Sequence, residues 1–146
     1  MMATLKFDDG RINLAVNDTG RIFSFNPADP NVYDGFFTLL EETPQKINKL
    51  SIEEEKLNAQ ELDEKSRTQE QLKIHAEIDK ILREAFDNIF GEGQADVMFG
   101  SQSTCALGSN GDFIFSNALM ALFPYFEKEM KKRQNKVKSV VKQYKE

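Results

Sequence analysis

The chain carries one cysteine, Cys105, and one histidine, His75, the two residue types that combine in many nucleophilic sites. A cysteine nucleophile needs a base to take its proton, and His75 is the only imidazole that could serve. One histidine also cannot supply the two imidazoles of a typical zinc or iron site. The sequence therefore favours a packed or half-exposed His75, and a catalytic pair of these two residues is the disfavoured alternative.

Three glycines stand among large apolar residues in residues 89–100, IFGEGQADVMFG. The pair Gly91 and Gly93 looks like part of a dinucleotide-binding fingerprint, but that motif follows a strand and opens a helix, whereas this pair follows a helical pattern. No glycine of the chain is followed directly by Lys and then Ser or Thr, as a P-loop requires. We expect Gly91 to end a helix and residues 97–99 to return apolar side chains to the core.

The carboxylates at residues 53–55 and 63–64 lie in a long polar run, where nothing would raise a pKa for acid–base work. Residues 108–112, GSNGD, have turn-forming residue types but lack the alternating acidic ligands of a calcium loop. The sequence thus predicts no catalytic residues, no cofactor and no metal, which are the expectations for a protein that is not an enzyme.

Length and composition predict one domain, residues 1–146, with a single core. A chain of 146 residues can bury roughly two-thirds of the surface of its unfolded state, and it is too short for two ordinary domains. Phenylalanine dominates the aromatic residues, with 12 Phe against 3 Tyr and no Trp. Rings without a polar group fill cores or line grooves that face a partner.

Charge is distributed unevenly along the chain. Residues 127–146 carry eight Lys or Arg against three Glu, a net charge of +5, which leaves −10 on residues 1–126. Nucleic-acid binding by the body is disfavoured by this charge. The basic end is a solvated helix end, a partner-binding or oligomer-forming helix, or, least favoured, a nucleic-acid contact. No secretory signal and no run of about 20 apolar residues is present, so we expect a soluble intracellular protein.

Alternating residues near the start of the sequence predict a β-hairpin region over residues 1–26. Residues 12–16 and 21–25 alternate apolar with polar or small side chains, and residues 17–20, NDTG, supply turn chemistry between them. Residues 4–7, TLKF, are a further candidate for a short strand. An isolated hairpin is only marginally stable, so these strands must pack on helices or pair with another copy.

Residues 29–130 are predicted to form a helical body, because their apolar residues recur with helical spacing. Asp29 and the following proline are a typical helix start, and apolar positions then recur at steps of three and four up to residue 50. The charged segment 51–70 has few apolar positions and predicts an exposed charged helix or its loop. Further amphipathic stripes span residues 72–89 and 115–130, and residues 131–146 form a basic helical end. The predicted fold class is α+β, mostly helical, with an N-terminal hairpin and about three amphipathic helices.

The order of three segments resembles one known family. These are FSFNPADPNVYDGFFTLLEE, the helix end IDKILREAFDNIFGEGQADVMFG and the following GSNGDFIFSNALMALFPYFEKEM, which together cover most of residues 21–130. In this order and spacing they resemble the small tail assembly chaperones of long-tailed, siphovirus-type phages and prophages of Gram-positive bacteria. Phe-Gly and Asn-Pro pairs are common singly, so the order and spacing carry the resemblance.

The resemblance implies a non-enzymatic protein of the host bacterial cytoplasm. Such proteins bind the tape-measure protein, help recruit tail-tube protein around it, and are absent from the finished particle. Candidate partner contacts are Phe36, Phe37, Phe123 and Phe126, for each of which the core is the competing location. The alternative function is a structural tail or virion component, or an adaptor, that self-associates through the hairpin edge and the C-terminal helix; a homo-oligomer is compatible with either.

Overall fold

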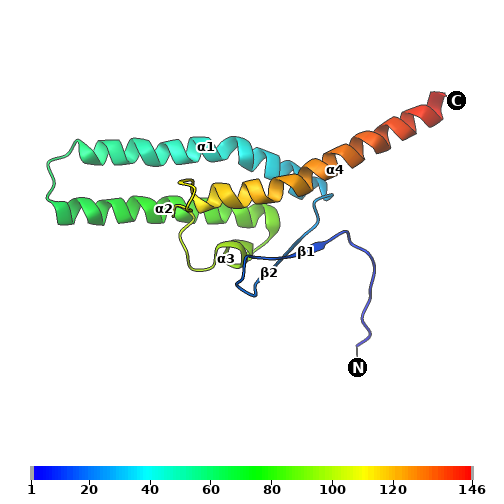
Figure 1. The fold of residues 1–146 in the computed structure, drawn as a ribbon, viewed down its shortest axis with the longest axis horizontal. Helices are drawn as coiled ribbons and strands as arrows, with labels where there is room; N and C mark the ends of the chain where they lie inside the picture. Colours follow the sequence, from blue (N-terminus) through cyan, green and yellow to red (C-terminus); the bar gives the residue numbers. More distant parts are fainter. Residues whose placement is uncertain (1, 146) are drawn as a thin grey trace.

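A computed structural model describes residues 2–145 of the chain as two strands followed by four helices (Figure 1). The elements are β1 (Ile12–Ala15), β2 (Ile22–Phe25), α1 (Pro30–Asn58), α2 (Glu64–Phe90), α3 (Gln94–Phe99) and α4 (Ile114–Lys145). This order confirms the predicted fold class, a mostly helical α+β protein with an N-terminal hairpin.

The hairpin has the predicted place and turn. Strands β1 and β2 pair antiparallel, with Leu14 opposite Phe23, and Asn17 and Gly20 have positive φ angles in the turn between them. The prediction of a possible short strand at residues 4–7 was wrong, because this segment forms no strand in the structure. The Asn26 side chain instead donates to the backbone carbonyl of Asp9 at 2.9 Å, and this bond holds the chain across the end of the hairpin.

Helix α1 begins where the sequence predicts and runs further than expected. The Asp29 carboxylate accepts a hydrogen bond from the Asn31 backbone N–H at 3.0 Å, and proline occupies the first helical position. The helix continues through Pro44 as far as Asn58. It therefore takes in the first part of the charged segment 51–70.

The charged segment forms the tip of a long antiparallel helical pair, α1 and α2, which extends to one side of the molecule (Figure 1). Asp63 caps α2 by accepting from the Ser66 N–H at 2.7 Å, and this bond lowers the pKa of the Asp63 carboxyl. The structure thus bears out the exposed charged helix and its loop, but α2 begins at Glu64 rather than near residue 72. A good cap and strong helix formers extend it beyond its apolar stripe.

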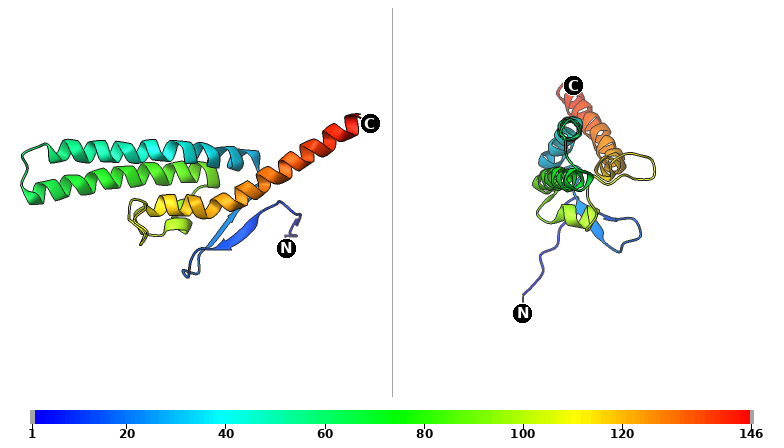
Figure 2. Two further views of the ribbon diagram at one scale, coloured as in Figure 1. Left: turned by 45° about the horizontal axis from the view of Figure 1, so that its top comes forward. Right: turned by 90° about the vertical axis from the view of Figure 1, so that its left-hand side faces the viewer.

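Aromatic rings from both sequence ends meet in one core. It unites buried side chains from β2 and all four helices with half-buried side chains of β1. The fully buried phenylalanines are Phe23, Phe36, Phe86, Phe115 and Phe126. Viewed along the helical pair, α1, α2 and α4 surround a common axis while the N-terminal segment runs away from the body (Figure 2).

The basic end of α4 projects beyond the rest of the molecule (Figures 1 and 2). It is helical as predicted, and near its start Arg133 anchors it to the body by donating to the Ala28 carbonyl and by lying 4.7 Å from the ring centre of Tyr33. Within residues 2–145, no helix combines the length and the apolar character that crossing a bilayer requires.

Candidate functional site

Cys105 and His75 both lie near the Glu54 carboxylate, but the two side chains do not form a pair. His75 Nε2 lies 2.6 Å from Glu54 Oε1, so the histidine joins α2 to α1, and it is half-buried as the sequence favoured. Burial raises the pKa of the Cys105 thiol, and the negative charges of Asp79 and Glu54 raise it further. Among the described residues no hydrogen bond joins these two side chains, and no three His, Cys, Asp or Glu residues gather as a metal site.

The glycines after α2 end that helix and start α3. Gly91 has a φ of 115° and donates its N–H to the Asp87 carbonyl, as predicted for a helix end. The Asp87 carboxylate accepts from the N–H groups of Gly93 at 3.2 Å and Ala95 at 2.7 Å. A carboxylate of the chain itself therefore occupies the backbone donors that a phosphate would need.

A polar cluster that sequence reasoning missed ties the loop after α3 to α2. Asp79 Oδ1 accepts from the backbone N–H of Thr104 at 2.7 Å and from its hydroxyl at 2.6 Å. Arg83 donates to Asp79 at 3.1 Å and to the carbonyl oxygens of Gly100 and Gln102. The spacing of Asp79 and Arg83 along α2 is a recognisable ion-pair signal, but the sequence does not reveal their loop partners.

The four phenylalanines proposed as partner contacts separate into two pairs. Phe36 and Phe126 are fully buried and stack on each other, with ring centres 4.1 Å apart. Phe37 and Phe123 are half-buried, and their ring centres lie 6.2 Å apart where α1 and α4 meet. The first pair belongs to the core, and only the second pair can present part of its surface to a partner.

Around the second pair lies a surface that we call the α1–α4 face. It consists of half-buried apolar side chains from these two helices: Tyr33, Phe37, Leu40, Phe123 and Met130. The α1 members follow one another at steps of four and three, the spacing of one helix side. A shallow depression of about 620 Å³ opens on this face, and the acidic residues Asp34 and Glu41 lie at its rim.

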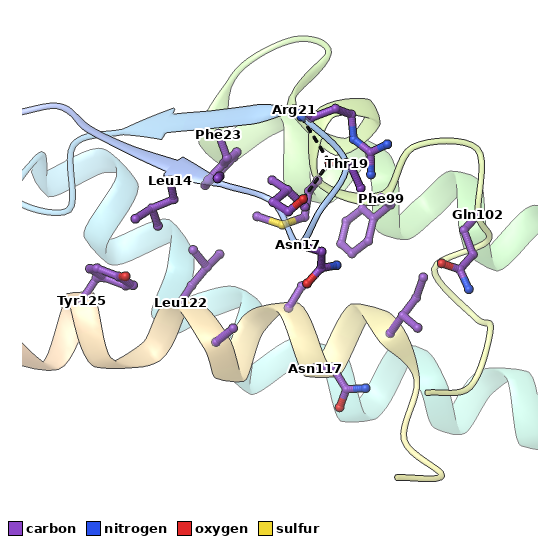
Figure 3. Close-up of a pocket in the computed structure, with 16 residues that line it drawn as sticks. Leu14, Asn17, Thr19, Arg21, Phe23, Phe99, Gln102, Asn117, Leu122 and Tyr125 are labelled. Atoms are coloured by element: carbon purple, nitrogen blue, oxygen red, sulfur yellow. Dashed lines mark hydrogen bonds between the residues drawn. The ribbon is translucent and has the colours of Figure 1, made fainter. Parts of the chain in front are cut away.

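A second hollow, which we call the hairpin groove, lies between β1 and α4 (Figure 3). Its volume is about 570 Å³, within the range of ligand-sized pockets. In Figure 3 the side chains of Leu14 and Asn17 on the hairpin lie opposite Asn117 and Leu122 on α4. The apolar lining comes from Leu14, Ala15, Val16, Phe23, Met98, Phe99, Ile114, Ala118, Ala121, Leu122 and Tyr125.

One cation lies in the wall of the hairpin groove. Arg21 donates from Nε to the Val97 carbonyl at 2.7 Å, and this bond holds its guanidinium against the C-terminal end of α3. Within the described residues no carboxylate lies within ion-pair distance of Arg21. The sequence offered no signal for this groove, because its walls come from segments about 80 to 100 positions apart.

Gly100→Ala is expected to destabilise the protein by about 1 kcal/mol more than the control Gly111→Ala. Both glycines have positive φ angles, of 62° and 84°, so both alanines would be strained. Only at Gly100 would the new Cβ meet another group, because the Arg21 guanidinium would lie 2.9 Å from it. Moving the guanidinium away would break the hydrogen bond from Arg21 to the Val97 carbonyl. Urea unfolding of both variants measures the difference, and equal losses would contradict this packing.

Comparison of the chain with protein-family models, with curated proteins and with solved structures found no match.

Proposed function

We propose that this protein is a tail assembly chaperone of a long-tailed phage or prophage. In this proposal it binds apolar helices of the tape-measure protein in the host cytoplasm, assists the assembly of tail-tube protein around them, and leaves the finished virion. The single observation that carries the proposal is the α1–α4 face, an apolar strip with a charged rim on a helical body. The choice of the tape-measure protein as the partner depends on the resemblance of three ordered segments to this chaperone family.

The chemistry of the α1–α4 face suits an amphipathic helix. Such helices bind through apolar side chains spaced at three, four and seven positions, and aromatic residues supply the largest share of the binding energy. Phe37 and Phe123 offer two rings from different helices, and Met130 adds an adaptable side chain. The acidic residues Asp34 and Glu41 lie at the rim, and Arg133 lies 4.7 Å from the ring centre of Tyr33, so the face favours a partner helix with charges of both signs beside its apolar stripe.

The combined variant Phe37→Ala and Phe123→Ala is expected to bind the tape-measure protein at least about 30-fold more weakly than the wild-type chain. Ile81→Ala removes an exposed apolar side chain from α2, outside the face, and serves as the control. Co-purification of the two tagged proteins, followed by titration with fragments of the tape-measure protein, measures the effect. Circular dichroism establishes that each variant is folded. Unchanged binding by the folded double variant would overturn the role of this face.

A structural virion component or adaptor is the second candidate. The observation that favours it is the open edge of the two-stranded hairpin, because an unpaired strand can accept a strand from another molecule. Mass spectrometry of purified particles separates the two candidates. A structural subunit is present in stoichiometric amounts, whereas a chaperone is absent.

A further inference from the structure

Among the residues that the structure describes, no strand pairs with the edge of β1 that faces away from β2. The Val16 N–H donates to the Arg21 carbonyl at 2.9 Å, which identifies this pair as hydrogen-bonded across the hairpin. Hydrogen-bonded and non-hydrogen-bonded pairs alternate in an antiparallel ladder, so the N–H and C=O groups of Asn13 and Ala15 point to the free edge. The end of β1 therefore offers two residues that can pair with an added strand.

The hairpin groove lies beside this free edge. Residues 14–16 at the end of β1 line it in succession, whereas β2 contributes only Phe23. Side chains of a strand alternate between its two faces. A strand added to β1 would therefore direct every second side chain toward the core side of the hairpin, where the groove is lined mainly by apolar groups.

The N-terminal segment of the chain, residues 4–9, has the composition that fits this site. Leu5 is 86% exposed and Phe7 is 74% exposed, and neither belongs to the core or to the side chains packed against it. They are two positions apart, so an extended chain presents both on one side. Asp8 follows directly and brings a carboxylate, which complements the Arg21 guanidinium in the groove wall, a cation with no ion-pair partner among the described residues.

The segment of the same copy is held away from this edge. Asp9 is bonded to Asn26, which follows the end of β2, and a Cβ on Gly10 would lie 2.8 Å from that asparagine side chain. The segment then leads away from the helical body (Figures 1 and 2). Reaching its own groove would require the bond between Asn26 and Asp9 to break, whereas the segment of a second copy meets the groove with that bond intact.

We propose that two copies of the chain exchange their N-terminal segments. Residues 4–7 of each copy pair with the free edge of β1 in the other, and Leu5 and Phe7 enter its hairpin groove. The exchange is reciprocal, so the dimer has two-fold symmetry and both apolar segments are covered. This pairing does not involve the α1–α4 face, so it stands or falls separately from the proposed function.

The first test is the oligomeric state of the purified full chain at micromolar concentration, measured by sedimentation velocity. The wild-type chain is expected to be a dimer, and the combined variant Leu5→Ser and Phe7→Ser is expected to dissociate about 100-fold more readily. These side chains are exposed in the single copy, so their replacement leaves its core intact. Met2→Ser is the matched control, because Met2 is 96% exposed and lies on the opposite side of an extended chain. A monomeric wild type, or a dimer insensitive to the double variant, overturns the proposal.

The second test changes the hairpin groove instead of the segment that enters it. Ala121 lines the groove and is exposed on α4, so Ala121→Arg is expected to fold normally and to be monomeric. Mixing it with the Leu5→Ser and Phe7→Ser variant should restore a one-to-one heterodimer, because one copy then supplies an intact segment and the other an intact groove. A labelled peptide of residues 2–9 should bind the segment variant and not Ala121→Arg. Failure of the mixture to associate, or equal peptide binding by both variants, contradicts the exchange.

Discussion

Phe126→Ala is expected to destabilise the protein by about 3–5 kcal/mol, the range for removing a fully buried ring. Phe126 has no exposed surface, stacks on Phe36, and lies near rings from β2, α1 and α2. Its removal therefore loosens contacts between elements from both ends of the chain. Domains of this size are commonly stable by about 5–15 kcal/mol, so the variant is expected to be partly unfolded at growth temperature.

Phe123→Ala, three positions earlier on α4, is the matched control for this core effect. The same ring is removed from the same helix, but Phe123 is half-buried and is expected to cost about 1–2 kcal/mol. Urea unfolding monitored by circular dichroism measures both values. Equal losses for the two variants would mean that Phe126 does not occupy the centre of the core.

Asp79→Ala is expected to cost about 2–3 kcal/mol, with its effect concentrated in the loop that follows α3. The substitution leaves the buried N–H and hydroxyl of Thr104 without their acceptor, and it deprives Arg83 of one carboxylate. Because the Asp79 and Arg83 side chains keep about a fifth of their surface exposed, water offsets part of the loss. The value is accordingly lower than for a fully buried ion pair.

Hydrogen exchange is the measurement that separates this local effect from general destabilisation. Amides of residues 100–106 should lose protection in Asp79→Ala at least about tenfold more than those of α1. The reason is that the loop of this variant can open without first breaking hydrogen bonds to Asp79. Glu77→Ala, on an exposed position of α2, should change neither region. Uniform loss of protection across the chain would contradict the role of Asp79 as a local anchor.

Local signals in the sequence were sufficient for much of the fold. The turn at residues 17–20, the Asp29 cap and the Gly91 helix end each depend on residues within a few positions, and all three are in place. Helix α3 was missed because six residues are too few to display a helical period. The strand expected at residues 4–7 failed for a different reason, since alternation indicates a suitable strand but not whether a partner strand is present.

The candidate site was less predictable than the fold. The apolar stripe of α1 includes Phe36 and not Phe37, so helical periodicity alone could have assigned the first to the core and the second to its margin. No local pattern could indicate that Asp79 would meet Thr104, or that Arg21 would lie in a groove beside α4. These contacts join distant parts of the sequence and depend on how the elements pack.

The most direct test of the chaperone proposal is an affinity capture of the tagged protein from cells in which its phage or prophage is active, with purified particles analysed alongside by mass spectrometry. We expect the wild-type chain to recover the tape-measure protein, and we expect the combined Phe37→Ala and Phe123→Ala variant to lose it. We also expect the proposed chaperone to be absent from the purified particles. Stoichiometric presence in the particles, or capture without the tape-measure protein, would contradict the proposal.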